Sequence, residues 1–214
     1  MTQRDASEGE RSHSLGVSGF WSPGNAAARL ARAPLHWCVV GGWAIDLWLG
    51  YDSRPHADLE ISVPRESYGA LAAWLHELEP YAIGHGKMYA LTTETPFPSD
   101  RHQLRFIDAK EKAWRLDVML DPGDSETWIY RRDEQLRVPR SRLVAWRGFI
   151  PYLRPEAVLL FKAKATREKD ERDFETCLPR LDGAATEWLA TSLDRLHPGH
   201  PWIARLQAGP PQSD

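Results

Sequence analysis

The chain has 214 residues, of which 42% are hydrophobic and 27% are charged, and its formal net charge at pH 7 is −3. This composition is that of an ordinary globular protein that can bury a sizeable core. The slightly negative charge argues against a protein that mainly binds along the phosphate backbone of nucleic acid, although it does not exclude one local basic pocket. The two cysteines, Cys38 and Cys177, lie in apolar segments, so we expect no disulfide framework and a reducing, cytoplasmic setting.

The sequence pattern of the first part of the chain predicts a tail followed by alternating helices and strands. Residues 1–23 are polar and show no hydrophobic period, which is typical of a disordered tail. A short helix capped by Asn25 is expected next. A buried strand is predicted at residues 36–40, and then a helix at residues 43–49 that Gly50 ends as a C-terminal glycine.

The middle of the chain predicts more strands than helices. A helix should begin after Pro64, because apolar residues then recur at helical spacing, and a looser region with several glycines and prolines follows at residues 79–98. Alternating or continuous apolar runs predict strands at residues 57–63, 103–108, 114–120, 128–132 and 144–150.

The last quarter of the chain predicts helices alone, at residues 156–178 and 184–196. We therefore place a domain boundary between residues 150 and 151. The predicted fold class is α+β, with a mixed sheet flanked by helices in residues 24–150 and a small helical domain in residues 151–214.

Two acids on an apolar background form the first candidate site. Asp58 and Glu60 are two residues apart in a predicted strand, so their side chains should project from one face, roughly 6–7 Å apart. Two carboxylates at this spacing repel one another unless a cation lies between them. Mg²⁺ fits this role, because it takes oxygen ligands and leaves positions open for substrate phosphates.

A glycine pair precedes these acids. Gly41 and Gly42 follow an apolar run and open the predicted helix, so the backbone could approach a phosphate closely there. The N–H groups and the positive dipole end of the helix would favour the same anion. Together with the acids, this stretch predicts a site for a phosphate, a metal ion and a nucleotide.

A third acid, Asp117, lies mid-strand among apolar residues, where an uncompensated charge is costly. A metal shared with Asp58 and Glu60 would offset this cost. The alternative is that Asp117 forms a salt bridge with a neighbouring arginine while Asp58 and Glu60 face water.

These motifs resemble the nucleotidyltransferase superfamily with a polymerase-β-type palm, and most closely its aminoglycoside 2″-adenylyltransferase-like branch. The sequence carries G-G-W-A-I-D at residues 41–46, R-P-H-A-D-L-E-I-S-V at 54–63 and L-D-V-M-L at 116–120. The similarity continues through W-I-Y-R-R-D at 128–133, P-E-A-V-L-L-F-K-A-K at 155–164 and K-D-E-R-D-F at 169–174. One departure is Glu60, where an aspartate is more common in the superfamily.

The resemblance implies a palm-like sheet and a two-metal transfer of a nucleoside monophosphate, most simply AMP from ATP, to a hydroxyl group. Gly41 and Gly42 would contact the phosphates, while Asp58 and Glu60 would hold two Mg²⁺ ions. Asp117 would complete the metal site or accept the proton of the acceptor hydroxyl, with Glu156 as the second candidate for that base. Such a pair of ions can stabilise both the attacking and the leaving oxygen.

Several cations are candidates for the triphosphate. Related enzymes use a lysine in the region of Lys162 and Lys164, and only one of the two should reach the site because residues two apart do not share a helix face. Arg54 would support a phosphate or fix the loop before the acidic strand. His56 would either bind a ligand carboxylate or fix that loop, and Asp46 is expected to make a structural hydrogen bond.

The acceptor predicted from the resemblance is a small, aminoglycoside-like molecule. One alternative is a toxin-like enzyme that modifies RNA or protein, which would need a broad basic cleft, and another is a nucleotide-binding protein without turnover. The residues that would form the basic cleft are Arg131, Arg132, Arg137, Arg140 and Arg142.

Overall fold

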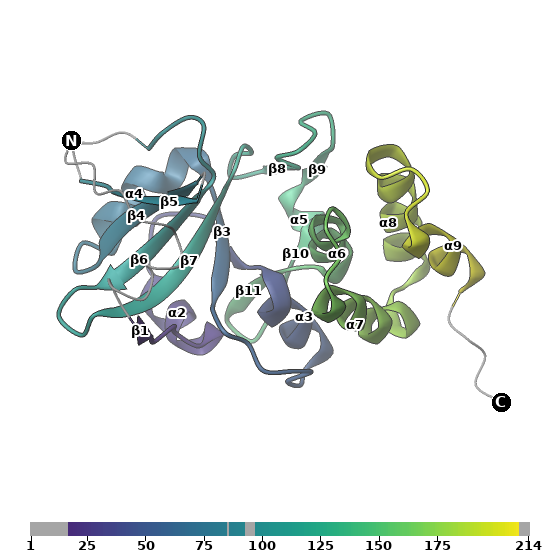
Figure 1. The fold of residues 1–214 in the computed structure, drawn as a ribbon, viewed down its shortest axis with the longest axis horizontal. Helices are drawn as coiled ribbons and strands as arrows, with labels where there is room; N and C mark the ends of the chain where they lie inside the picture. The colour runs from purple at the N-terminus through teal and green to yellow at the C-terminus, as the bar shows by residue number, and fades with distance from the viewer. Residues whose placement is uncertain (1–16, 85, 93–96, 210–214) are drawn as a thin grey trace.

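The computed structural model describes residues 17–84, 86–92 and 97–209. Nine strands within these ranges form one mixed sheet (Figure 1). They are β1 (Val17–Ser18), β2 (Cys38–Val39), β3 (Glu60–Pro64), β4 (Glu79–Gly84), β5 (Lys87–Ala90), β6 (Gln103–Asp108), β7 (Ala113–Asp121), β10 (Val144–Arg147) and β11 (Ile150–Leu153). The path through the sheet is β10-β11-β2-β3-β7-β6-β4-β5, and β1 pairs with the start of β7. A separate ribbon joins β8 (Thr127–Ile129) to β9 (Arg137–Pro139).

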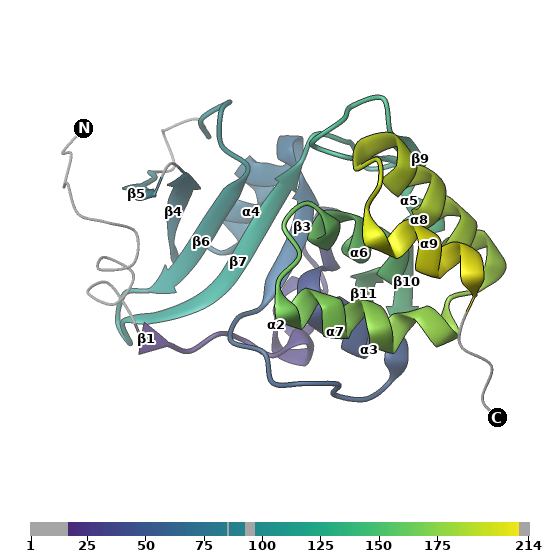
Figure 2. The same cartoon turned by 45° about the vertical axis from the view of Figure 1, so that its right-hand side comes forward.

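The helices cover the sheet and extend beyond one of its ends. They are α2 (Pro23–Leu30), α3 (Gly41–Leu49), α4 (Tyr68–Trp74), α5 (Arg140–Leu143), α6 (Pro155–Ala163), α7 (Glu168–Cys177), α8 (Gly183–Leu196) and α9 (Pro201–Ala208). Helix α3 contacts both α6 and α7, while α8 packs on α6 and α9 (Figure 2). The α+β class with a mixed sheet, flanking helices and a helical C-terminal part is confirmed.

The central strands β3 and β7 are parallel, and their register pairs Glu60 with Asp117. On β7 the side chains of Leu116, Val118 and Leu120 are fully buried, as the predicted alternation requires. The opposite face of the two strands carries polar side chains, including Asp117. The hydrophobic core therefore packs on one face of the β3–β7 pair, and the other face of the pair is available for polar contacts.

The N-terminal part differs from the prediction of a tail over residues 1–23. Residues 1–16 lie outside the described residues, but Val17 and Ser18 pair with Ala113 and Trp114 of β7, and Trp21 is buried. The polar composition of this segment gave no indication of the pairing, because the pairing depends on backbone hydrogen bonds to β7 and not on a hydrophobic pattern. The cap of α2 is Ser22, whose hydroxyl accepts from the amide of Asn25, one turn earlier than predicted.

The predicted boundary at residues 150 and 151 falls inside β11, which pairs with β10 and with β2 of the main sheet. The prolines at positions 151 and 155 suggested a break, but Pro151 is accommodated in the strand and only Pro155 opens a helix. The division into two domains stays a prediction.

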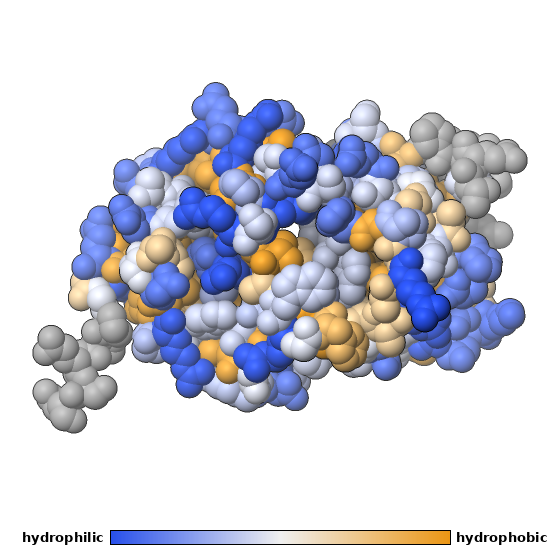
Figure 3. All heavy atoms as spheres, turned by 180° about the vertical axis from the view of Figure 1, so that it is seen from behind, coloured by the Kyte–Doolittle hydropathy of each residue, from blue (hydrophilic) through white to orange (hydrophobic). Residues whose placement is uncertain are grey.

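On the face opposite to that of Figure 1, the described residues form hydrophobic patches that are separated by hydrophilic side chains (Figure 3). The most exposed aromatic residues within the described ranges are Trp146 and Phe149 of the β10–β11 hairpin. Among the described helices, none combines the length and hydrophobicity that crossing a bilayer requires.

Candidate active site

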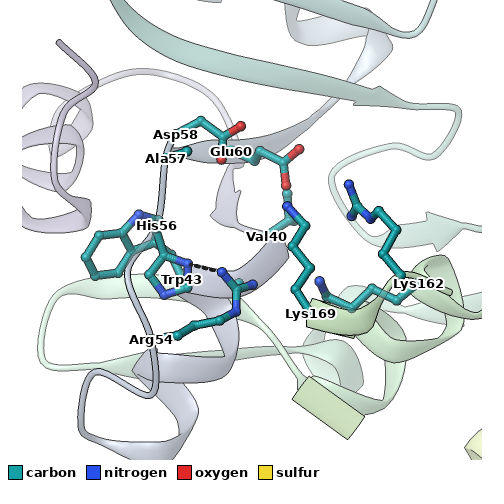
Figure 4. A pocket seen from close by; sticks show the side chains of 11 residues that line it. Val40, Trp43, Arg54, His56, Ala57, Asp58, Glu60, Lys162 and Lys169 are labelled. Carbon is teal, nitrogen blue, oxygen red and sulfur yellow. Dashed lines mark hydrogen bonds between the residues drawn. The ribbon is translucent and has the colours of Figure 1, made fainter. Parts of the chain in front are cut away.

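The two acids of the R-P-H-A-D-L-E segment line a polar pocket of about 110 Å³. Glu60 is the first residue of β3, and its carbonyl accepts a hydrogen bond of 2.9 Å from the amide of Val40. Asp58 lies just before the strand. Figure 4 shows both carboxylates on the strand side of the pocket, with Lys162 and Lys169 reaching in from the helices opposite.

The Glu60 carboxyl is held in an environment that disfavours its charge. Burial raises its pKa most, followed by repulsion from Asp58 and Asp117, and the pKa reaches about 7 even though Lys162 and Lys169 lower it. A bound cation would stabilise the charged form of Glu60, because the cation would relieve the repulsion that raises the pKa. The chemistry of Asp58 and Glu60 therefore fits one divalent metal ion.

The glycine pair makes room for the side chains that surround the pocket. Gly41 has a φ of +68°, and a Cβ at this position would collide with the carboxylate of Glu60. A Cβ at Gly42 would lie 2.6 Å from the ring of His56 and would collide with Arg54. Gly42 lines the pocket at the start of α3, whose first N–H groups have no side-chain cap. The glycines are thus required for close packing of charged groups here as well as for any approach of a phosphate.

Four cations line the same pocket. Arg54 comes from the loop before β3, Lys162 from the last turn of α6, Arg167 from the cap position of α7 and Lys169 from its first turn. Lys162 and Lys169 face the two acids, so the pocket has one acidic wall and one basic wall. A pocket with these two walls can bind a metal ion and the phosphate groups that the ion contacts.

Two buried aspartates of α7 hold this basic wall. Asp173 accepts from Arg54 Nε at 2.8 Å and Nη2 at 3.0 Å, and from Lys162 Nζ at 2.8 Å. Asp170 accepts from Lys162 Nζ at 2.8 Å and from Arg167 Nε at 2.7 Å. Despite their burial, the pKa of both carboxyls is lowered by these partners, that of Asp170 to about 2. Arg54, Lys162 and Arg167 are therefore fixed in place by the fold.

A second chain of hydrogen bonds fixes Arg54 from the other side. Arg54 Nη1 lies 3.1 Å from His56 Nδ1, and His56 Nε2 lies 2.6 Å from the Oδ2 of Asp46. A guanidinium can only donate, so Nδ1 of His56 accepts and Nε2 carries the proton that is donated to Asp46. The ring of His56 also packs 4.4 Å from that of Trp43. His56 thus fixes the loop, and Asp46 has the structural role expected of it.

The third acid, Asp117, binds an arginine, which is the alternative that the sequence left open. Its carboxylate accepts from Arg105 Nη2 at 2.7 Å and also from Arg105 Nε. Asp117 is 1% exposed and is not among the residues that line the pocket. It lies close enough to raise the pKa of Glu60. No group of three histidine, cysteine or acidic side chains within the described residues is arranged to hold a metal ion.

The other predicted site residues divide into those that reach the pocket and those that do not. Lys162 lines it, whereas Lys164 is exposed and points elsewhere, as the two-residue spacing on a helix requires. Glu156, the second candidate for a base, is buried at the start of α6 away from the pocket lining, and burial raises its pKa.

Four residues of the site were missed by the sequence reasoning. Arg167 and Lys169 line the pocket, while Asp170 and Asp173 support it. The K-D-E-R-D-F segment entered the sequence prediction only through the resemblance. The available signal was spacing: Asp170 and Asp173 fall at helical spacing with Phe174 and Cys177, which places both aspartates on the buried face of α7.

The comparisons with known proteins agree with the resemblance noted in the sequence. A model of the family described as Aminoglycoside-2″-adenylyltransferase matches residues 25–118, which include Gly41, Gly42, Asp58, Glu60 and Asp117. The resemblance is therefore confirmed over this part of the chain. None of the curated proteins matches the sequence.

Solved structures give more distant likenesses. Lincomycin-bound lincosamide antibiotic adenylyltransferase LnuA is 16% identical, with 71% of this chain and 90% of that chain covered and a TM-score of 0.49. The solution structure of the antibiotic-resistance factor ANT(2″)-Ia is 16% identical, with 85% and 90% covered and a TM-score of 0.49. Its crystal structure with adenylyl-2″-tobramycin is 17% identical with the same coverage and a TM-score of 0.42. At these scores the likenesses do not establish a shared activity.

Proposed function

We propose that this protein is a Mg²⁺-dependent nucleotidyltransferase that transfers AMP from ATP to a hydroxyl group of a small, aminoglycoside-like acceptor. The observation that carries the proposal is the pocket in which Asp58 and Glu60 face Arg54, Lys162 and Lys169. The family match over residues 25–118 supports the class of reaction and of acceptor.

The residues of the pocket divide the work of such a transfer. Asp58 and Glu60 would hold a Mg²⁺ ion, which supplies charge neutralisation at the phosphate under attack. Arg54, Lys162 and Lys169 would bind the remaining phosphate oxygens and favour departure of pyrophosphate, because its negative charge increases as it leaves. Asp170 and Asp173 keep two of these cations in position before substrate binds, so little reorganisation is needed during the reaction.

A transfer assay tests the proposal directly. The protein is incubated with Mg²⁺ and ATP labelled at the α-phosphate, together with a panel of aminoglycosides, tRNA and cell extract. We expect label on one or more aminoglycosides and release of pyrophosphate. Lys169→Ala should reduce the transfer, whereas Lys164→Ala is a matched control, since both lysines are exposed and only Lys169 lines the pocket.

Other outcomes would favour the alternatives. Label on RNA or protein would favour a toxin-like nucleotidyltransferase, and binding of ATP without transfer to any acceptor would favour a nucleotide-binding protein without turnover. The broad basic cleft required by the first alternative finds little support. Arg140 is buried against Asp121, Arg132 donates to the Phe161 carbonyl, and Arg137 donates to the carbonyl of Glu134.

A further inference from the structure

Arg105 of β6 and Asp117 of β7 are directly opposite one another in the antiparallel register of these strands. Asp117 is in turn paired with Glu60 in the parallel register of β7 and β3. The three side chains therefore follow each other across one face of the sheet, from the pocket towards its far side. Asp58 and Glu60 reach the pocket, whereas Asp117 is covered by Arg105.

The contact between Arg105 and Asp117 occupies both carboxylate oxygens. Nε of Arg105 donates to Oδ1, and Nη2 donates to Oδ2 at 2.7 Å. This is the planar, two-pronged pairing for which a guanidinium is suited. The guanidinium also lies 5.6 Å from the ring of Phe20 and 5.4 Å from that of Trp114, so aromatic rings fix its position.

This arrangement bears on the number of metal ions that the pocket can take. A second ion shared by Asp117 would have to displace Arg105 from an acid that is 1% exposed, and a partly buried arginine without its carboxylate is unfavourable. The ion would also be repelled by the same guanidinium at close range. The pocket already holds four cations on its other wall, which adds to this repulsion.

We propose that Arg105 is a positioning residue that holds Asp117 outside the metal site, so that the pocket takes a single divalent ion on Asp58 and Glu60. The inference rests on the proposed nucleotidyltransferase function and departs from the two-ion arrangement expected from the sequence. Arg105 provides at Asp117 the positive charge that a second ion would otherwise supply.

The test counts bound ions directly. Mn²⁺ serves as the probe, the protein is saturated with a non-hydrolysable ATP analogue, and the bound Mn²⁺ is measured by equilibrium dialysis with detection of free Mn²⁺ by electron paramagnetic resonance. We expect one ion per chain in the wild type and two in Arg105→Met, because this change releases the carboxylate of Asp117. Arg115→Met is the matched control and should stay at one, since Arg115 projects from the neighbouring strand β7 but binds Asp108 and Glu111.

A second variant covers the case in which Arg105→Met does not fold. Asp117→Asn should leave the Mn²⁺ dissociation constant within about twofold of the wild type, while Asp58→Asn should raise it at least tenfold. Equal losses in the two variants would identify Asp117 as a ligand and overturn the inference. So would two ions in the wild type, or one ion in a folded Arg105→Met, although the proposed function would stand. Absence of any bound Mn²⁺ would instead remove the proposed function together with the inference.

Discussion

One face of the β3–β7 strand pair carries acids at both ends, and the charge of these acids is compensated differently at the two ends. At the start of β3, Glu60 is next to Asp58 and its pKa is raised to about 7 by burial and by neighbouring acids. At the end of β7, Asp121 accepts from the hydroxyl of Ser62 at 2.9 Å, from Arg140 Nη2 at 2.6 Å and from the amide of Gly123 at 3.1 Å. Both acids are largely buried, but only Asp121 has its charge fully compensated.

This difference distinguishes an acid that stabilises the fold from one that serves a site. A buried carboxylate with three donors, one of them an arginine, lowers the free energy of the folded state without needing a ligand. A carboxylate beside a second one destabilises the protein until a cation binds, which is the usual sign of a functional position. Asp117 lies between the two ends and resembles Asp121 more closely, because Arg105 binds it.

The largest expected effect is on transfer of AMP, at the acidic end. Asp58→Asn or Glu60→Gln should lower the transfer rate at least about 10³-fold, because a metal ion contributes several kcal/mol to stabilising the charge of the transition state. The measurement is the rate of label transfer with saturating ATP and Mg²⁺. Asp121→Asn is the contrasting variant: the fraction that folds should keep a rate within about tenfold of the wild type. A loss in Asp121→Asn that matches the pocket variants would mean that the two ends are not distinct.

The next largest effect is on stability, at the compensated end. Arg140→Met should lower the free energy of unfolding by about 3 kcal/mol, because it leaves the buried charge of Asp121 without its main partner. Urea unfolding followed by tryptophan fluorescence measures this change. Arg137→Met is a suitable control, since that exposed side chain donates only to the carbonyl of Glu134, and it should change the stability by less than about 0.5 kcal/mol. A stable Arg140→Met would show that Asp121 is not structural.

The sequence predicted the regular parts of this fold and the acidic wall of the pocket. The alternation around Asp117 located β7, because strand periodicity depends only on local order. Asp58 and Glu60 line one pocket as expected, although the strand predicted from residue 57 begins only at Glu60 and Asp58 lies before it. Helix geometry predicted that only one of Lys162 and Lys164 would reach the site, and Lys162 is the one that lines the pocket.

The basic wall and the partner of Asp117 were not predicted, because both depend on contacts between distant segments. Asp173 reaches Arg54 across 119 positions of sequence, and no local pattern indicates such a pair. Arg105 was expected only as part of a strand, and its pairing with Asp117 follows from the register of β6 against β7. Register is set by the whole sheet and by the turns between its strands.

A smaller effect concerns the pH dependence of stability without metal. The pKa of Glu60 is raised from 4.5 to about 7, so between these values the folded protein keeps a proton that the unfolded chain has released. The free energy of unfolding should therefore fall as the pH rises from 5 to 8. We expect the Glu60 contribution to be about 2 kcal/mol, less than the full shift would give, because solvent enters the pocket.

The measurement is urea unfolding in EDTA, with the curve for Glu60→Gln subtracted from that of the wild type. The subtraction removes the contribution of the histidines, whose pKa values also influence stability in this range. Asp170 does not interfere, because its pKa of about 2 confines its contribution to acidic conditions. A difference that is flat from pH 5 to 8 would show that Glu60 is already compensated in the free protein, like Asp121.

The smallest effect tests whether the basic wall is held in place for a nucleotide. Asp173→Asn keeps the shape of the side chain but removes the charge that fixes Arg54 and Lys162. We expect the dissociation constant of ATP with Mg²⁺ to rise about tenfold, or about 1.4 kcal/mol, because both cations lose their preorganised position. Calorimetry measures this constant. Glu168→Gln is the matched control on the same helix, because its pair with Arg172 is exposed and neither residue lines the pocket.

The direction of the change separates two roles for Asp173. If its charge mainly competes with the phosphates for Arg54 and Lys162, its removal would release both cations and ATP would bind more tightly. If it mainly orients them, binding weakens, since Arg54 would lose the partner that fixes its two donor groups at 2.8 and 3.0 Å. The second outcome is expected, because His56 holds only one edge of the guanidinium and cannot orient it alone.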